Sequence, residues 1–154
     1  MAAQKILVPY NFAGSDQKAL DFVVCTFANR EDAEITLFHV HAAVPEIEVR
    51  GSPIMEKMTA NLGYLSQKIR EKEEELKLVK NNLVMNGFSE SRIQTVFEAK
   101  KKDAAGDIVD HAQKGNYNVV VLNRKPGKIS RFFAGSVYNK VVTSLKGVTV
   151  CIVS

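Results

Sequence analysis

Hydrophobic residues along the chain fall into short apolar runs that alternate with longer segments of helical spacing. The run KILVPY at Lys5–Tyr10 is ended by the turn-rich letters NFAGS, which predicts a strand followed by a loop. The next segment, SDQKALDFVVCTFA, predicts a helix with Ser15 as its N-cap. A second strand is predicted at Glu34–Val40, where the sequence reads EITLFHV.

A long helix is predicted over residues 54–85, after the breaker-containing segment AAVPEIEVRGSP. Its apolar residues form a heptad-like stripe, interrupted by Lys72, that consists of Met55, Met58, Leu62, Leu65, Ile69, Leu76, Val79 and Leu83. The stripe is typical either of a helix with a coiled-coil partner or of a helix that lies on a sheet with EKEEELK as its solvated outer end. We favour the second interpretation, because the stripe spans only about four heptads and Gly63 interrupts its first half.

The remainder of the chain keeps the same alternation. RIQTVFEA, NVVVLN and VTVCIV predict strands, while DAAGDIVDHAQK and SVYNKVVTSLK predict helices closed by Gly115 and Gly147. Strands joined through crossover helices run parallel, and the fully apolar run VVVL suits a strand that is covered on both faces. The sequence therefore predicts an α/β fold, a doubly wound three-layer α/β/α sandwich of five strands and four helices.

Length and composition limit the organisation of the chain. With 154 residues, of which 45% are hydrophobic, it has the size of one domain and enough apolar material for a continuous core, so we expect a single domain over residues 1–154. The N-terminal sequence MAAQKILVPY lacks the pattern of a secretory signal, and no stretch approaches the length of a bilayer span. We expect a soluble cytoplasmic protein that does not associate with membranes.

The cysteines and histidines do not form a metal-binding pattern. Cys25 and Cys151 lie inside apolar segments, where a reduced cysteine behaves as a small hydrophobe, and we expect both in the core. Strand alternation places His39 and His41 on one face, but no Cys, Asp or Glu stands at ligand spacing beside them. We expect no metal site.

Charge is distributed unevenly. No Asp or Glu follows Asp110, whereas seven lysines and arginines do, so the last part of the chain carries +7 and the first 110 residues carry −3 of the net +4. An anionic ligand or partner is therefore drawn to the C-terminal third. Nucleic acid is not the expected anion, because the basic residues are not interleaved with aromatic residues in any familiar module.

Ligands of doubly wound sheets bind outside the carboxyl ends of the strands. Three predicted loops leave those ends: PYNFAGS, HVHAAV and the basic stretch NRKPGKISRFFAGS, residues 123–136. Gly135 and Ser136 precede the last predicted helix, whose free N–H groups favour a phosphate, although for Ser136 alone we favour a simple N-cap over a phosphate ligand. The side chains of Arg124, Lys125 and Lys128 in the same loop are also able to hold phosphates.

These segments together resemble the universal stress protein family. KILVPYNF, LFHV, VVVLNRK leading to AGSVYNKVV, and VTVCIV carry the resemblance, which covers nearly the whole chain. It implies a Rossmann-like, five-stranded parallel sheet of the adenine nucleotide alpha hydrolase-like kind. It also implies a homodimer formed through the last strand, residues 148–153, and, in one branch of the family, a bound ATP.

The fingerprint of the ATP-binding branch is only partly present. That fingerprint reads Gly, two residues, Gly, nine residues, then Gly-Ser or Gly-Thr, and here Gly127 is separated from Gly135 by seven residues. If one residue is missing, Asn123 and Pro126 take the glycine positions, and Pro126 has a fixed φ and no N–H. Asn11 stands where the family has Asp, which removes a charge. We therefore expect no tight ATP binding of the family type.

The sequence leaves two functions open. The first is a stress-response or regulatory protein that acts through contacts with itself and an unknown protein partner. The alternative is an adenine nucleotide-binding stress protein, whose ligand (ATP, ADP or AMP) would contact Pro9, Asn11, Val40, Asn123, Arg124, Gly127, Lys128, Arg131, Gly135, Ser136 and Val137. Neither function is enzymatic, because GxSxG and GxxxxGK[ST] motifs are absent and no catalytic residues are apparent.

Overall fold

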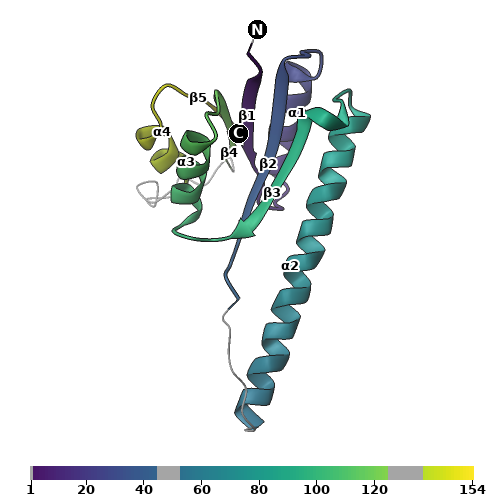
Figure 1. Ribbon diagram of the computed structural model, residues 1–154, viewed down its shortest axis with the longest axis vertical. Helices are drawn as coiled ribbons and strands as arrows, with labels where there is room; N and C mark the ends of the chain where they lie inside the picture. Colours follow the sequence, from purple (N-terminus) through teal and green to yellow (C-terminus); the bar gives the residue numbers. More distant parts are fainter. Residues whose placement is uncertain (1, 45–52, 125–136) are drawn as a thin grey trace.

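The computed structural model describes residues 2–44, 53–124 and 137–154, apart from the side chain of residue 55. Five parallel strands form one sheet and four α-helices cover it (Figure 1). The elements are β1 (Gln4–Pro9), α1 (Asp16–Phe27), β2 (Ala33–His41), α2 (Pro53–Met85), β3 (Ile93–Ala99), α3 (Ala104–Lys114), β4 (Val119–Asn123), α4 (Val137–Ser144) and β5 (Thr149–Val153), with a short 3-10 helix at Glu90–Arg92. The predicted alternation of strands and helices is confirmed.

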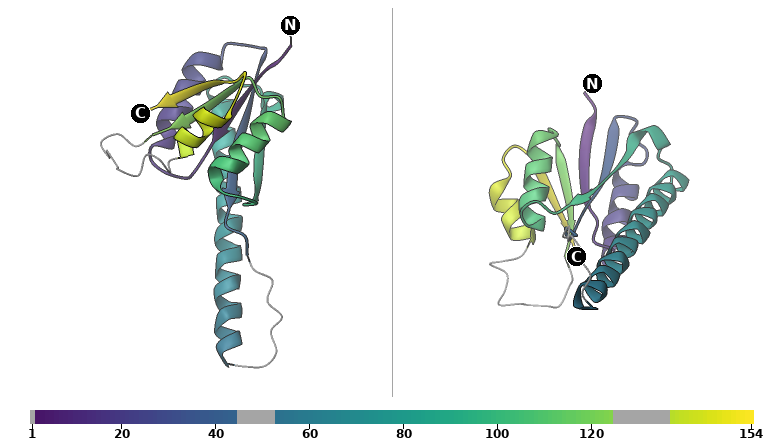
Figure 2. Two further views of the ribbon diagram at one scale, coloured as in Figure 1. Left: turned by 90° about the vertical axis from the view of Figure 1, so that its left-hand side faces the viewer. Right: turned by 60° about the horizontal axis from the view of Figure 1, so that its bottom comes forward.

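The sheet has a helical layer on each face. α1 and α2 cover one face and α3 and α4 the other, as the right-hand view of Figure 2 shows. Alternate residues of β1 point into the two layers: Ile6 and Val8 pack with α1 and α2, whereas Leu7 packs with α3 and α4. All three side chains are fully buried, which explains why this strand is apolar at every core position. The predicted three-layer sandwich is therefore confirmed.

The strand order is β3-β2-β1-β4-β5, so the direction in which strands are added reverses between β1 and β4. These two strands are direct neighbours, with Ile6 opposite Val119 and Leu7 opposite Val120. Their carboxyl ends meet at one edge of the sheet, the position where doubly wound folds place their ligands.

The long helix α2 extends well past the sheet (Figure 1). Its 33 residues correspond to roughly 50 Å. Leu76 and Leu83, in its C-terminal half, are completely buried against the sheet and α1. Ile54, Tyr64 and Leu65, in its N-terminal half, are 73%, 60% and 47% exposed. The prediction that the whole stripe lies on the sheet is therefore correct only for the C-terminal half. The prediction that EKEEELK is the outer end of the helix was wrong, because Leu76 within this segment is buried in the core.

Two helix boundaries differ in detail from the prediction. Ser15 occupies the position before α1 but makes no side-chain capping bond, and the carboxylate of Asp16 accepts loop N–H groups instead. Gly115 does follow α3, where a Cβ atom would lie 2.4 Å from the Tyr117 ring, so the glycine is needed for space. Gly147 has φ +69° but lies three residues beyond the end of α4 at Ser144.

The prediction for Cys25 was wrong. It is exposed, because α1 turns Ala19, Leu20, Val23 and Phe27 toward the core and leaves position 25 outside that face. Cys151 is half-buried and packs against the core. In the parts of the chain that the structure describes, no helix is both long enough and apolar enough to cross a membrane.

Candidate functional site

A cavity of about 490 Å³ opens at the carboxyl edge of the sheet, where β1 and β4 end. We name it the switch-point cavity; it is lined by Pro9, Asn11, Ala13, Ser15, Ala104, Ile108, Leu122, Asn123, Arg124, Val137 and Tyr138. These residues come from the end of β1 and its following loop, the N-terminal part of α3, the end of β4 and the start of α4. The cavity therefore lies where the topology predicts a ligand.

The buried carboxylate of Asp16 organises this edge. One of its oxygens accepts backbone N–H groups from Asn11 at 3.0 Å and Ala13 at 2.8 Å, and the other accepts the side-chain amide of Asn123. The Ser15 hydroxyl donates to the amide oxygen of Asn123 at 3.3 Å. The loop after β1 is thereby fastened to the end of β4, and the Asn123 side chain is fixed in orientation.

Sequence reasoning missed Asp16. It assigned the family's Asp position to Asn11, which contributes its exposed side chain to the cavity wall and its N–H to Asp16. The signal in the sequence was an acidic residue in the first turn of a helix, next to a predicted capping serine. Its partner Asn123 lies 107 positions away, so the sequence alone did not connect the two.

Among the described residues that line the cavity, Arg124 is the one charged side chain. Its backbone N–H donates to the carbonyl of Val153 at 2.7 Å, so the residue is anchored to the end of β5 while its side chain is exposed. A guanidinium group in this position favours an anionic ligand and is able to hold two oxygens of a phosphate or carboxylate.

The structure brings together five of the predicted ligand contacts: Pro9, Asn11, Asn123, Arg124 and Val137. Val40 is not among the residues that line the switch-point cavity, because it lies in β2, on the far side of β1 from β4, and borders a different cavity. The other predicted contacts, Gly127, Lys128, Arg131, Gly135 and Ser136, lie outside the described residues.

Ion pairs at the surface hold α3 and α4 beside the cavity. Asp103 caps α3 by accepting the N–H of Gly106 at 2.6 Å, and the ammonium of Lys140 on α4 lies 2.8 Å from its carboxylate. The bond from Lys140 is the main cause that lowers the pKa of Asp103, with the N–H of Gly106 second. Because Ala104 and Ile108 follow this cap directly, the pair helps to place one wall of the cavity.

His39 has a structural role. Its Nδ1 atom lies 2.7 Å from the carbonyl oxygen of Tyr10, so the ring donates a hydrogen bond there, and burial lowers the pKa of the imidazole. His39 and His41 both stack on Phe97, as strand alternation predicts for one face. Within the described residues no group of histidines, cysteines and acids is arranged to hold a metal ion.

The switch-point cavity combines apolar walls, two amides, two hydroxyls and a guanidinium group. Pro9, Ile108 and Leu122 offer contact to a flat apolar ligand surface, while Asn11 and Arg124 offer polar groups. The Ser15 hydroxyl is bonded to an amide, which is not a base. The described residues thus supply groups that bind and orient a polar, anionic molecule.

Comparison with known proteins places the chain in a family. The model of the universal stress protein family matches residues 2–152. The universal stress protein UspA from Lactobacillus plantarum has a similar structure, with a TM-score of 0.71 at 18% identity over 100% of this chain and 99% of that one. A search of curated proteins finds no match.

Two further structures of similar fold contain nucleotides. The universal stress protein from Archaeoglobus fulgidus in complex with dAMP has a TM-score of 0.64 at 15% identity and covers 100% of both chains. A universal stress protein family protein from Arabidopsis thaliana with AMP bound has a TM-score of 0.60 at 15% identity over 97% of this chain and 90% of that one. At these identities the likeness is one of fold.

Proposed function

Because the chain belongs to the universal stress protein family, we propose that it is a cytoplasmic, non-enzymatic regulatory protein that acts through protein contacts. We further propose that its switch-point cavity binds an adenine nucleotide without tight affinity for ATP. The observation that carries the proposal is the place of this cavity, between the ends of β1 and β4, where the strand order reverses.

The size of the cavity and its groups support a nucleotide with one phosphate. Its volume of about 490 Å³ is within the usual range for small-molecule sites. The proteins of similar fold that contain dAMP and AMP hold nucleotides of this size. In this chain the base would lie against Pro9, Ile108 and Leu122, and the phosphate would face Arg124.

We also propose a homodimer formed through the last strand. β5 lies at the edge of the sheet with β4 as its single neighbour, and its Ile152 side chain is 43% exposed. An unpaired edge with an exposed apolar residue favours pairing with a second copy across a two-fold axis. Arg124 connects the switch-point cavity to β5, because it lines the cavity and its backbone N–H donates a hydrogen bond to the carbonyl of Val153. In this proposal, a nucleotide bound in the cavity would lie next to the dimer contact.

Thermal unfolding of nucleotide-stripped protein tests the proposal. AMP, ADP and ATP are added separately at millimolar concentration, with adenosine as the control that lacks phosphate. A ligand at about a hundred times its dissociation constant stabilises the native state by roughly 2.7 kcal/mol, which raises Tm by roughly 5–10 °C for a domain of this size. We expect AMP to raise Tm by at least as much as ATP. Equal Tm values with and without every nucleotide would contradict the binding proposal.

A further inference from the structure

Lys72 interrupts the apolar stripe of α2 at the junction between the half that packs on the sheet and the half that extends beyond it. Its ammonium lies 5.7 Å from the centroid of the Phe12 ring. Lys68, one turn earlier, is paired with Glu71 at 3.0 Å. Within the described parts of the chain, no carboxylate forms an ion pair with Lys72. A cation is therefore present, without an acidic partner, at a position where the stripe predicts an apolar residue.

A second cavity, of about 250 Å³, lies beside this cation. We name it the β2–α2 cavity, because its walls come from the end of β2, the residues that follow it and α2. Val44, Leu65 and Ile69 supply apolar walls, His39, His41 and Lys68 also line it, and Lys72 stands in the same lining. The described lining residues include no Asp or Glu. The cavity therefore offers apolar contact together with positive charge.

The two cavities share no lining residue among those the structure describes, and the loop after β1 separates them. Asn11 and Ala13 line the switch-point cavity, whereas Phe12 points the other way, with its ring 4.8 Å from His39 and close to Lys72. Phe12 has φ 59°, a left-handed conformation that is uncommon for an aromatic residue. A ligand in one cavity therefore need not displace a ligand in the other.

We propose that the β2–α2 cavity binds a small monocarboxylate with an aromatic or short alkyl body. The body lies between Leu65 and Ile69 of α2 and Val44, which follows β2, and the carboxylate faces the ammonium of Lys72. The apolar walls would contact the aromatic or alkyl body of the ligand, and the ammonium of Lys72 would attract its carboxylate. The volume of about 250 Å³ suits a molecule of this size and is small for a nucleotide.

The proposal is independent of nucleotide binding in the switch-point cavity. A ligand in the β2–α2 cavity would connect the extended half of α2 to the sheet, since Leu65 and Ile69 belong to that half and Val40 belongs to β2. A bound carboxylate would fasten this half of the helix to the end of β2. The exposed apolar residues Ile54 and Tyr64, further along the same half, would then be held in a fixed orientation relative to the sheet.

The test uses phenylacetate and hexanoate as probes, followed by methyl and amide NMR of the full chain. Phenylacetamide keeps the aromatic body without the charge, and acetate keeps the charge without the body. We expect both probes to shift the signals of Val40, Leu65 and Ile69, and to bind about tenfold more tightly than either control compound. Absence of binding by both probes at millimolar concentration, or shifts confined to Asn123 and Arg124, would overturn the proposal.

Two variants locate the charge. Lys72→Met replaces lysine by an unbranched apolar side chain one heavy atom shorter and restores the apolar stripe, so the helix is expected to fold. It should weaken phenylacetate binding about tenfold and leave phenylacetamide binding unchanged. Lys77→Met, on the same helix but paired with Glu74 away from the cavity, is the matched control and should bind phenylacetate as the unaltered protein does. Equal binding of phenylacetate by Lys72→Met and Lys77→Met would show that Lys72 is not the counter-charge and would overturn the assignment.

Discussion

The two cavities at the carboxyl edge of the sheet arise from different kinds of structure. The switch-point cavity exists because strand order reverses between β1 and β4, a property of the fold that similar proteins share. The β2–α2 cavity exists because α2 continues past the sheet and because Lys72 breaks its stripe, features of this sequence. One edge therefore combines a cavity that follows from the topology and a cavity made by one helix.

Their surroundings differ as well. The switch-point cavity is connected through Arg124 and Val153 to β5, the strand for which we propose dimer contacts. The β2–α2 cavity lies on the other side of β1 and is connected to the extended half of α2. Substitutions at one cavity should therefore leave ligand binding in the other cavity, and the surface next to it, largely unaffected.

The largest effect is expected from Asp16→Ala. The substitution leaves the N–H groups of Asn11 and Ala13 and the amide of Asn123 without their acceptor, in a buried place. We expect the free energy of unfolding, measured with urea, to fall by about 2–4 kcal/mol and AMP binding to be lost. Asp21→Ala, on the exposed face of the same helix, is the control and should change stability little. Equal stability of the two variants would contradict the role given to Asp16.

Ile152→Lys should convert the proposed dimer to a monomer. An exposed lysine on an edge strand repels its copy across a two-fold axis and removes the apolar contact. Val142→Lys, which places the same charge on exposed α4 rather than on β5, should remain dimeric. Sedimentation of both variants at micromolar concentration makes the comparison. A monomeric unaltered protein, or a dimeric Ile152→Lys variant, would contradict pairing through β5.

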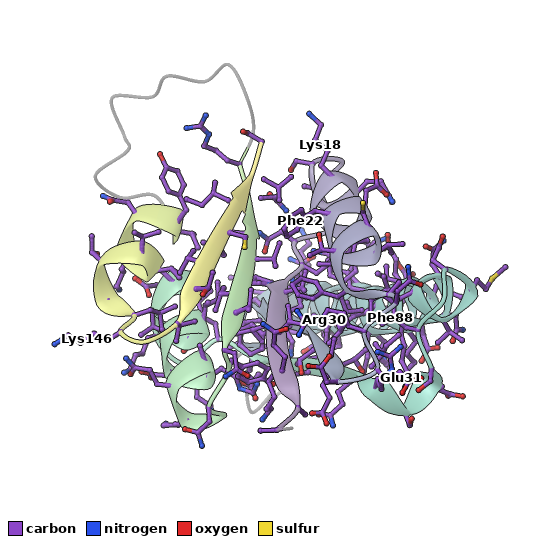
Figure 3. The ribbon with its side chains drawn as sticks, turned by 90° about the horizontal axis from the view of Figure 1, so that it is seen from above. Lys18, Phe22, Arg30, Glu31, Phe88 and Lys146 are labelled. Atoms are coloured by element: carbon purple, nitrogen blue, oxygen red, sulfur yellow. The ribbon has the colours of Figure 1, made fainter. Side chains whose placement is uncertain are left out.

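Arg124→Gln tests the phosphate end of the switch-point cavity. Loss of a charge-assisted hydrogen bond should weaken AMP binding by about 1.5–3 kcal/mol, or roughly tenfold or more, and leave adenosine binding unchanged. Lys146→Gln removes the same charge from a side chain that points outward beyond α4 (Figure 3) and should bind AMP normally. Calorimetric titration with AMP measures the dissociation constants of the two variants. Phenylacetate binding in the β2–α2 cavity should be the same in both variants.

The smallest effect concerns pH. Burial lowers the pKa of His39 and of His111 below their ordinary value of 6.5, so the unfolded chain binds protons on these groups more readily than the folded chain. Their neutral forms therefore favour the folded state above pH 6.5, and this contribution is lost as the pH falls below that value. We expect the free energy of unfolding to decrease on acidification from pH 7 to about 5, and to decrease less in His39→Gln. A pH-independent free energy would contradict this account.

The order of strands and helices was predictable because each element has a local pattern. The apolar runs of β1 and β4 and the helical spacing of α3 are present in a few adjacent residues, and burial on both faces of the sheet produces them. The position of the switch-point cavity follows from that order. Pro9, Asn11, Asn123, Arg124 and Val137, which were predicted to lie together, do line this one cavity.

Other features depend on distances that local pattern does not contain. The stripe of α2 has one period throughout, and only the length of the sheet decides that Leu76 is buried while Leu65 is exposed. The role of Asp16, in α1, depends on its contact with Asn123 at the end of β4, 107 positions away in the sequence. Phe12, which lies between the two cavities, has a left-handed backbone conformation in a loop, and the sequence carries no periodic signal that predicts it.

The central claim is that an adenine nucleotide binds in the switch-point cavity, and an amide NMR titration of nucleotide-free protein with AMP tests it most directly. The account predicts saturable shifts at Asn11, Ala13, Asn123 and Arg124, which line that cavity, and unchanged signals at Leu65 and Ile69. Unchanged signals at all of these residues up to millimolar AMP, or shifts that appear only along α2, would contradict it.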